Sequence, residues 1–281
     1  MGGCVAIQRL VSKKPRLMTM SGVWVNAEIK NLGMQKLWRI GLSRNGRKKD
    51  FLCTDNQRWF VRGGAGPRSM TERETTELLF GTRLAYAFHE FSGLQKTGPA
   101  SFGIAHGFTF GDGSRQKHGS VARFDGEKDQ DLLRYFPATE VRRYGSRTQV
   151  GRLPLYFKDL PPLDEAPAYL YGWLAGYFAA DGCVSKDGQV ILSSASAENL
   201  EFVRILGNRL GVGTYGIKSQ RRIGFGREET DLYQITFINS TLAPKFFILS
   251  KHRERFVSAL KSKRQERERK GWVVSYWKKL I

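Results

Sequence analysis

Residues 174–182 read Leu-Ala-Gly-Tyr-Phe-Ala-Ala-Asp-Gly, an apolar run of small residues that ends on an acid and a glycine. If a helix begins near Tyr169, the residues with the smallest side chains recur three and four positions apart on one side. These residues are Ala175, Gly176, Ala179 and Ala180. A side with so little bulk lets a second helix approach almost backbone to backbone. Asp181 would lie in the last turn, where the negative end of the helix dipole disfavours an acid and a nearby cation would stabilise it.

A second copy of this pattern lies upstream, where residues 105–113 read Ala-His-Gly-Phe-Thr-Phe-Gly-Asp-Gly. The two copies share a glycine at the third place and the closing Asp-Gly. Packing of the two helices through Gly107 and Gly111 on one side, and Gly176 and Ala180 on the other, predicts that their terminal aspartates meet at one end. Two close carboxylates offer the oxygen ligands that hard divalent cations take. The alternative for either copy is a tightly packed helix that merely ends at Asp-Gly.

The downstream copy resembles the motif of the LAGLIDADG homing endonucleases, in the form that carries two motifs in one polypeptide. The upstream copy departs from that motif at His106, Thr109 and Phe110, where the family has alanine, isoleucine and aspartate. The resemblance covers residues 100–255 and implies an α+β fold. It implies a pseudo-two-fold pair of αββαββα repeats, at residues 100–160 and 165–255, whose two antiparallel sheets bind DNA.

The resemblance also implies a chemistry and a set of site residues. Asp112 and Asp181, with the backbone carbonyls of Gly111 and Ala180, would hold Mg2+, for which Mn2+ could substitute. Lys218 aligns with the basic residue that the family places beside the metals, and Arg142 is the matching position of the first half by strand order. The implied reaction is hydrolysis of both strands of a long, nearly non-palindromic double-stranded DNA target by one monomer.

Alternation along the strands predicts which sheet faces meet DNA. In the segments 214–223 and 231–238 one face carries Lys218, Gln220, Arg222, Gln234 and Thr236. Arginine and lysine suit guanine in the major groove, and glutamine suits adenine. Further contacts are expected from Arg115, Lys117, Arg123, Arg143, Arg147 and Lys186. The alternative for these residues is a sheet face that is merely solvated.

Composition narrows the class of partner. The 281 residues include 46 Lys and Arg against 26 Asp and Glu, a formal net charge of +20 that favours a polyanion such as nucleic acid. A membrane surface is the rival partner, but the sequence contains no apolar run of about 18 residues and no signal-peptide pattern at its start. The three cysteines form no CxxC pair, which is typical of a reducing compartment. We therefore expect a cytoplasmic or organellar protein.

Residues 1–95 are expected to form a small β-rich domain, joined to the rest by a linker at residues 88–99. The segments 33–40, 53–60 and 77–84 resemble the Hint module of inteins, but Gln57 replaces the expected histidine, so splicing is not expected. A degenerate remnant or an accessory DNA-binding domain is the interpretation. Residues 256–281 are expected to be a basic tail, either an exposed helix or a disordered arm, whose segment 272–277 could pack back onto the core.

Two other functions stay open at this point. One is nucleic-acid binding without cleavage, as in a maturase that acts on intron RNA or in a regulator. The other is a splicing-defective intein.

Overall fold

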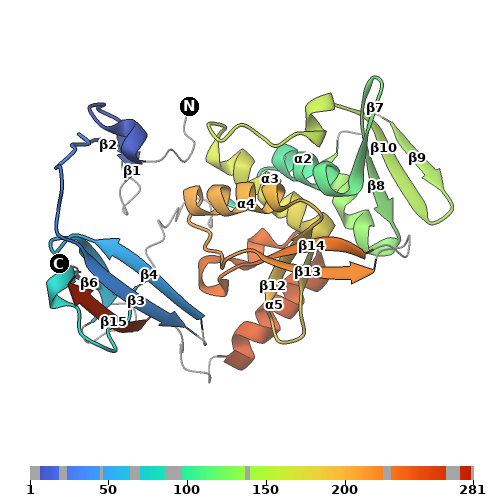
Figure 1. Ribbon diagram of the computed structural model, residues 1–281. Helices are drawn as coiled ribbons and strands as arrows, with labels where there is room; N and C mark the ends of the chain where they lie inside the picture. Colours follow the sequence, from blue (N-terminus) through green and yellow to red (C-terminus); the bar gives the residue numbers. More distant parts are fainter. Residues whose placement is uncertain are drawn as a thin grey trace. The chain divides into compact units, whose positions relative to one another are not determined.

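The computed structural model of the protein describes residues 7–18, 24–44, 47–63, 70–85, 97–136, 140–223, 229–263 and 273–279. The chain forms two compact units (Figure 1). The first is built from residues 88–264, and the second from residues 5–87 together with residues 265–281. Within the described ranges no helix has the length and hydropathy needed to cross a bilayer.

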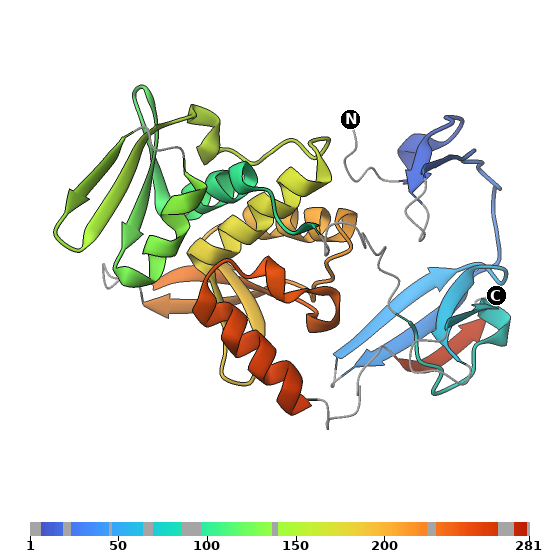
Figure 2. The ribbon, with the colours of Figure 1, turned by 180° about the vertical axis from the view of Figure 1, so that it is seen from behind.

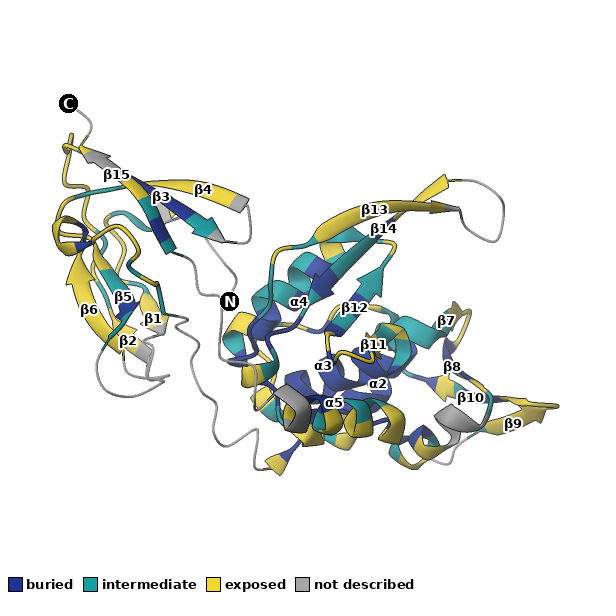
Figure 3. Cartoon of the chain, turned by 90° about the horizontal axis from the view of Figure 1, so that it is seen from below, coloured by how far each residue is buried: buried dark blue, intermediate teal, exposed yellow. Residues whose placement is uncertain are grey.

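Two helices lie side by side at the centre of the first unit (Figures 1 and 2). Helix α2 spans Ser101–Asp112 and helix α3 spans Pro167–Asp181. A methyl group on Gly107 would lie 1.9 Å from the carbonyl oxygen of Trp173, and one on Gly176 would lie 2.1 Å from that of Ile104. Only glycine permits this approach, so the expected packing through small residues is confirmed. Figure 3 colours both helices mostly as buried.

The first repeat wraps α2 with one antiparallel sheet. Its strands lie in the order β7-β8-β10-β9, and their bounds are Gly113–Gln116 (β7), Gly119–Asp125 (β8), Val141–Tyr144 (β9) and Arg147–Leu153 (β10). The 3-10 helix η3 (Glu127–Tyr135) follows β8, and η4 (Leu155–Lys158) follows β10. Alternation turns Ala122 and Phe124 of β8 toward the helices, where Phe124 stacks on Phe108 with ring centroids 4.9 Å apart.

The second repeat has the same order of elements and the same strand order, β11-β12-β14-β13. Its strands are Gly182–Val184 (β11), Val190–Ser194 (β12), Lys218–Ile223 (β13) and Glu229–Thr236 (β14). Its helices are α4 (Ala197–Arg209), η5 (Asn239–Thr241), η6 (Pro244–Phe246) and α5 (Ser250–Lys263). Two antiparallel sheets on a central helix pair thus confirm the predicted fold class.

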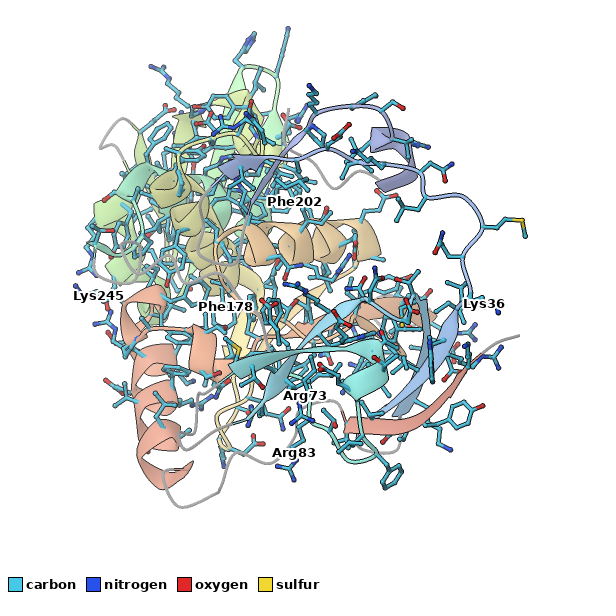
Figure 4. The ribbon with its side chains drawn as sticks, turned by 90° about the vertical axis from the view of Figure 1, so that its left-hand side faces the viewer. Lys36, Arg73, Arg83, Phe178, Phe202 and Lys245 are labelled. Atoms are coloured by element: carbon cyan, nitrogen blue, oxygen red, sulfur yellow. The ribbon has the colours of Figure 1, made fainter. Side chains whose placement is uncertain are left out.

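Apolar spacing explains how α4 covers the second sheet. Leu200, Val203 and Leu206 are fully buried, as their helical spacing predicted, and the Ser196 hydroxyl caps the helix by accepting a bond from the Asn199 N–H. Figure 4 labels Phe178 of α3 and Phe202 of α4, two of the rings packed around the helix pair. The ring of Phe202 packs edge-to-face on the indole of Trp173, with ring centroids 5.4 Å apart.

The second unit is β-rich, as expected, and contains a three-stranded sheet in the order β15-β3-β4. Its elements are η1 (Ile7–Leu10), β1 (Arg16–Met18), β2 (Trp24–Asn26), β3 (Trp38–Arg44), β4 (Arg47–Cys53), β5 (Arg58–Arg62), β6 (Met70–Glu74), η2 (Thr75–Glu77) and β15 (Val273–Lys279). Its small core joins Ile40, Leu42, Val61, Leu78 and Val274. The resemblance to a Hint module stays a prediction, and residues 88–96, most of the expected linker, lie outside the described residues.

The C-terminal residues differ from the expected separate tail of residues 256–281. The chain continues as α5 to Lys263, and β15 then pairs antiparallel with β3 and buries Val274 completely. The physical reason is the free edge of β3, whose backbone groups gain partners from β15, while Val274 joins the small core beside Ile40 and Leu42. The β-rich unit therefore needs both ends of the chain.

Candidate active site

The ends of the two central helices meet, and each ends on an aspartate. Asp112 is the last residue of α2 and Asp181 the last residue of α3. A methyl group on Gly111 would lie 2.5 Å from the Ala180 Cβ and 3.1 Å from Oδ2 of Asp181. The Asp181 carboxylate thus lies against the last turn of α2, one residue away from Asp112. The structure brings together all four residues that the sequence placed at a metal site.

A cation that the sequence analysis missed lies beside these carboxylates. Lys158, the last residue of η4, donates hydrogen bonds from Nζ to the carbonyl oxygen of Thr109, at 3.1 Å, and to that of Phe110. These carbonyls belong to the last turn of α2, where the negative end of the helix dipole favours a cation. The ammonium nitrogen also lies 5.6 Å from the centroid of the Phe110 ring.

The charges of this cluster act on one another in a partly desolvated setting. Burial raises the pKa of the Asp181 carboxyl to about 6, and the positive charge of Lys158 acts in the opposite direction. Burial lowers the pKa of Lys158, whereas the charges of Asp181 and Asp112 raise it. The cation that the position of Asp181 calls for is therefore Lys158. The signal for it in the sequence was a lysine near the end of the first repeat, after its last strand.

Lys218 and Arg142 occupy different places from Lys158. Lys218 begins β13, and Arg142 lies in β9, and both strands are at the edges of their sheets. Arg142 forms an ion pair with Glu140 at 2.7 Å. Among the described residues, Lys158 is the one whose charge acts on the Asp181 carboxyl. Lys158, which follows the last strand of the first repeat, reaches the carboxylates by turning back onto α2, and the expectation that Lys218 and Arg142 flank them stays a prediction.

Comparison with known proteins identifies part of the chain. Residues 168–249, which contain α3 and most of the second repeat, match the family model of the LAGLIDADG-like domain. This segment is a LAGLIDADG-like domain. No curated protein matches the chain.

The chain is also similar to several solved structures. One is of mesophilic variants from the homing endonuclease I-DmoI, with 15% identity, 58% of this chain and 96% of that chain covered, and a TM-score of 0.33. The N-terminal LAGLIDADG domain of DUF199/WhiA shows 17% identity, with 56% and 82% covered and a TM-score of 0.37. Full-length DUF199/WhiA from Thermatoga maritima shows 14% identity, with 58% and 60% covered and a TM-score of 0.40.

In the LAGLIDADG-like domain, strand register places the predicted polar residues on one face of the second sheet. Lys218 lies opposite Gln234, and Gln220 and Arg222 follow on the same side of β13. Thr236 shares that side of β14, whereas Ile235 faces the core. Lys186 lies in the turn between β11 and β12. The predicted alternation of this sheet is therefore confirmed.

The first sheet divides its predicted DNA contacts between two faces. Arg123 and Arg142 both lie opposite Gln149, so these three share the outward face. Arg147 belongs to this face as well and pairs with Asp125 at 2.9 Å. A polar cavity of about 270 Å³ opens here beside the turn that holds Lys117.

Arg115 and Arg143 lie on the opposite face of the first sheet. Arg115 reaches Asp159, which follows η4, in an ion pair of 2.5 Å. Arg143 lies opposite Thr148, whose side chain is buried on the side of the helices. Because side chains alternate along a strand, the residues next to Arg115 in β7 and next to Arg143 in β9 point outward. These two arginines, expected as DNA contacts, thus lie on the face that is turned toward the helices, and their contact with DNA stays a prediction.

Proposed function

We propose that the chain is a site-specific DNA endonuclease that cuts both strands of a long, nearly non-palindromic duplex by Mg2+-dependent hydrolysis. The observation that carries the proposal is the meeting of two helix ends that present Asp112 and Asp181, with the ammonium of Lys158 bound to the same turn of α2. A pair of carboxylates beside a cation is suited to phosphodiester hydrolysis, in which negative charge develops on phosphate oxygens.

The donor atoms at the two helix ends fit a hard divalent cation. The Asp181 carboxylate lies against Gly111, the neighbour of Asp112, so the two acids belong to helix ends that touch. Oxygen ligands of this kind are those that Mg2+ takes, together with water and substrate phosphates. Asp112 and Asp181 would hold Mg2+ with the carbonyls of Gly111 and Ala180, and Mn2+ would substitute. When bound, the ion supplies positive charge beside the scissile phosphate.

Lys158 would stabilise the phosphate from the other side. An ammonium group has three N–H donors, and two of those on Lys158 point to the carbonyl oxygens of Thr109 and Phe110. The third would be directed to a phosphate oxygen of the bound strand, where the positive charge opposes the charge that develops during hydrolysis. Lys158 would then act beside the two carboxylates, and the role expected for Lys218 stays a prediction.

The outward faces of the two sheets would hold the DNA. They carry different side chains, with Arg123, Arg142 and Gln149 in the first sheet and Lys218, Gln220 and Gln234 in the second. Such groups read base edges in the major groove. Because the two faces differ, the two halves of the target would differ as well. Both aspartates belong to one chain, so a monomer would cut both strands.

The test is cleavage of a pool of supercoiled plasmids with randomised inserts, incubated with the purified protein and Mg2+. We expect linear product, its loss with EDTA, and its loss in Asp112→Asn and in Asp181→Asn. Asp187→Asn, in the exposed turn between β11 and β12, is the matched control that should cut normally. Full cutting by either motif variant would refute the assignment of the carboxylates.

Binding without cleavage is the second candidate, and one observation favours it. The Lys158 ammonium already lies beside both carboxylates and offsets part of their charge, as a metal ion would. A protein of this kind would bind DNA or RNA equally well in EDTA and in Mg2+. If the protein binds plasmid DNA both in EDTA and in Mg2+, and cuts it in neither, the result would decide for this candidate.

A further inference from the structure

His106 is a buried histidine in α2, at a place where the upstream motif departs from its small-residue pattern. Its ring is 1% exposed and stacks on the ring of Phe157 in η4, with centroids 4.8 Å apart and planes 13° from parallel. Its Nδ1 lies 2.7 Å from the hydroxyl of Tyr169 in the first turn of α3, and its Nε2 lies 3.0 Å from the backbone carbonyl oxygen of Asp159. One side chain thus joins both central helices to the segment that carries Lys158.

The partners of His106 determine how its proton is placed. A carbonyl oxygen can only accept, so Nε2 must carry the hydrogen and donate it to Asp159. Nδ1 then holds the lone pair, and the Tyr169 hydroxyl must donate to it. The ring is therefore neutral, which agrees with the burial that lowers the pKa of His106 to about 4. The donors run in one direction, from Tyr169 through His106 to Asp159.

These bonds hold the residues on either side of Lys158. Phe157 is fully buried under the His106 ring, and Asp159 is held by its backbone through His106 and by its carboxylate through Arg115. Lys158 lies between these two fixed neighbours, so its stem can leave the backbone only in a narrow range of directions. Its ammonium then reaches the last turn of α2.

We propose that His106 and Tyr169 are positioning residues that place Lys158 beside the two carboxylates. The inference rests on the proposed nuclease function for its consequence, and on the hydrogen-bond geometry for the placement itself. A shift of about 1 Å in a group that acts on the reacting phosphate can cost up to a hundredfold in rate. The histidine at position 106, where the family motif has alanine, would thereby help to position a residue of the active site.

Tyr169→Phe tests this placement with little change in volume. It removes the donor to Nδ1, so His106 keeps its bond to the Asp159 carbonyl oxygen but loses the bond that fixes its ring to α3. Tyr171→Phe is the matched control, because Tyr171 lies in the same helix, is 2% exposed, and its hydroxyl has no hydrogen-bond partner among the described residues. Both variants lose one hydroxyl of α3, but only the first loses the bond to His106.

The first measurement is the reactivity of Lys158 in the full chain, read by reductive methylation and peptide mass spectrometry. We expect Tyr169→Phe to raise the methylation rate of Lys158 about fivefold, the effect of losing roughly one hydrogen bond. The rate should stay unchanged in Tyr171→Phe, and Lys117 should react alike in all proteins. Equal protection of Lys158 in both variants would overturn the placement, whether or not the protein cuts DNA.

The second measurement is a double-mutant cycle on single-turnover cleavage, with Lys158→Met as the other change. If Tyr169 acts through Lys158, Tyr169→Phe slows cutting about fivefold in the native chain and has no further effect once Lys158 is methionine. Equal slowing in both backgrounds would overturn the positioning role. If Lys158→Met cuts at the native rate, the nuclease role of Lys158 fails, while the methylation result still decides the placement.

Discussion

The close approach of α2 and α3 makes Gly107→Ala the sharpest test of the fold. The added methyl group would lie 1.9 Å from the carbonyl oxygen of Trp173 and 2.7 Å from the Tyr177 backbone nitrogen. Real Cβ atoms essentially never come nearer than 3.0 Å to such atoms, so the first contact falls short by 1.1 Å. Both neighbours are backbone atoms of a helix, which cannot rotate away as a side chain would. The helices must therefore separate.

The cost follows from two opposing effects. Alanine gains up to about 1 kcal/mol over glycine inside a helix. Overpacking of a tight core costs about 1–3 kcal/mol, and separation of the two helices also opens gaps along their whole contact. We expect a net loss of about 2 kcal/mol in the free energy of unfolding.

The assay is urea unfolding of the full chain followed by far-ultraviolet circular dichroism. Gly216→Ala is the control, because a methyl group there meets nothing within 4 Å, and we expect its unfolding midpoint to stay near the native value. A Gly107→Ala midpoint equal to that of Gly216→Ala would refute the reasoning. The same variant should weaken Mg2+ binding, since the two helix ends would no longer meet.

Three further outcomes are expected. The pKa of His106 is about 4 in the folded chain against an ordinary 6.5, so between these values the unfolded chain binds a proton that the folded chain does not, and stability falls as the pH falls. Asp181, whose pKa is raised to about 6, acts in the opposite direction in the same pH range, but equally in the native protein and in His106→Gln. Urea unfolding should therefore show that the native protein loses about 2 kcal/mol more than His106→Gln from pH 7 to pH 5; the same change in both proteins would contradict this. Mg2+ should raise the midpoint temperature of unfolding of the native protein, because a metal ion that binds only the folded state stabilises it. It should not raise the midpoint of Asp112→Asn or Asp181→Asn, and an equal rise in all three proteins would exclude the two aspartates as metal ligands. Arg222→Ala should weaken binding to a DNA duplex and reduce by about one the slope of log affinity against log salt concentration. Arg221 lies on the opposite face of β13, 3.7 Å from Glu229, so Arg221→Ala should leave this slope unchanged. Identical slopes for both variants would argue against DNA on the outward face.

Local pattern was enough to predict the centre of the molecule. Small residues four positions apart occur in both motif segments, and such spacing places them on one helix face, so the close pairing and the meeting of Asp112 with Asp181 could be expected. Strand alternation likewise predicted the outward face of the second sheet. In the first sheet the sequence did not decide on which face Arg115 and Arg143 lie, because short basic strands carry little apolar contrast to show which side is inward.

Tertiary structure alone decided the placement of Lys158 and of the C-terminal strand. Lys158 reaches the carboxylates because η4 is held against α2 by the stacking of Phe157 on His106, a contact between residues far apart in the sequence. β15 pairs with β3 across more than two hundred residues, as the bond from the Ser275 hydroxyl to the Gly41 carbonyl oxygen shows. The sequence by itself determined which helices touch and where their acids meet, since both follow from spacing along one element. Which cation joins them, and which strand closes the β-rich unit, depends on surfaces that exist only after the chain has folded.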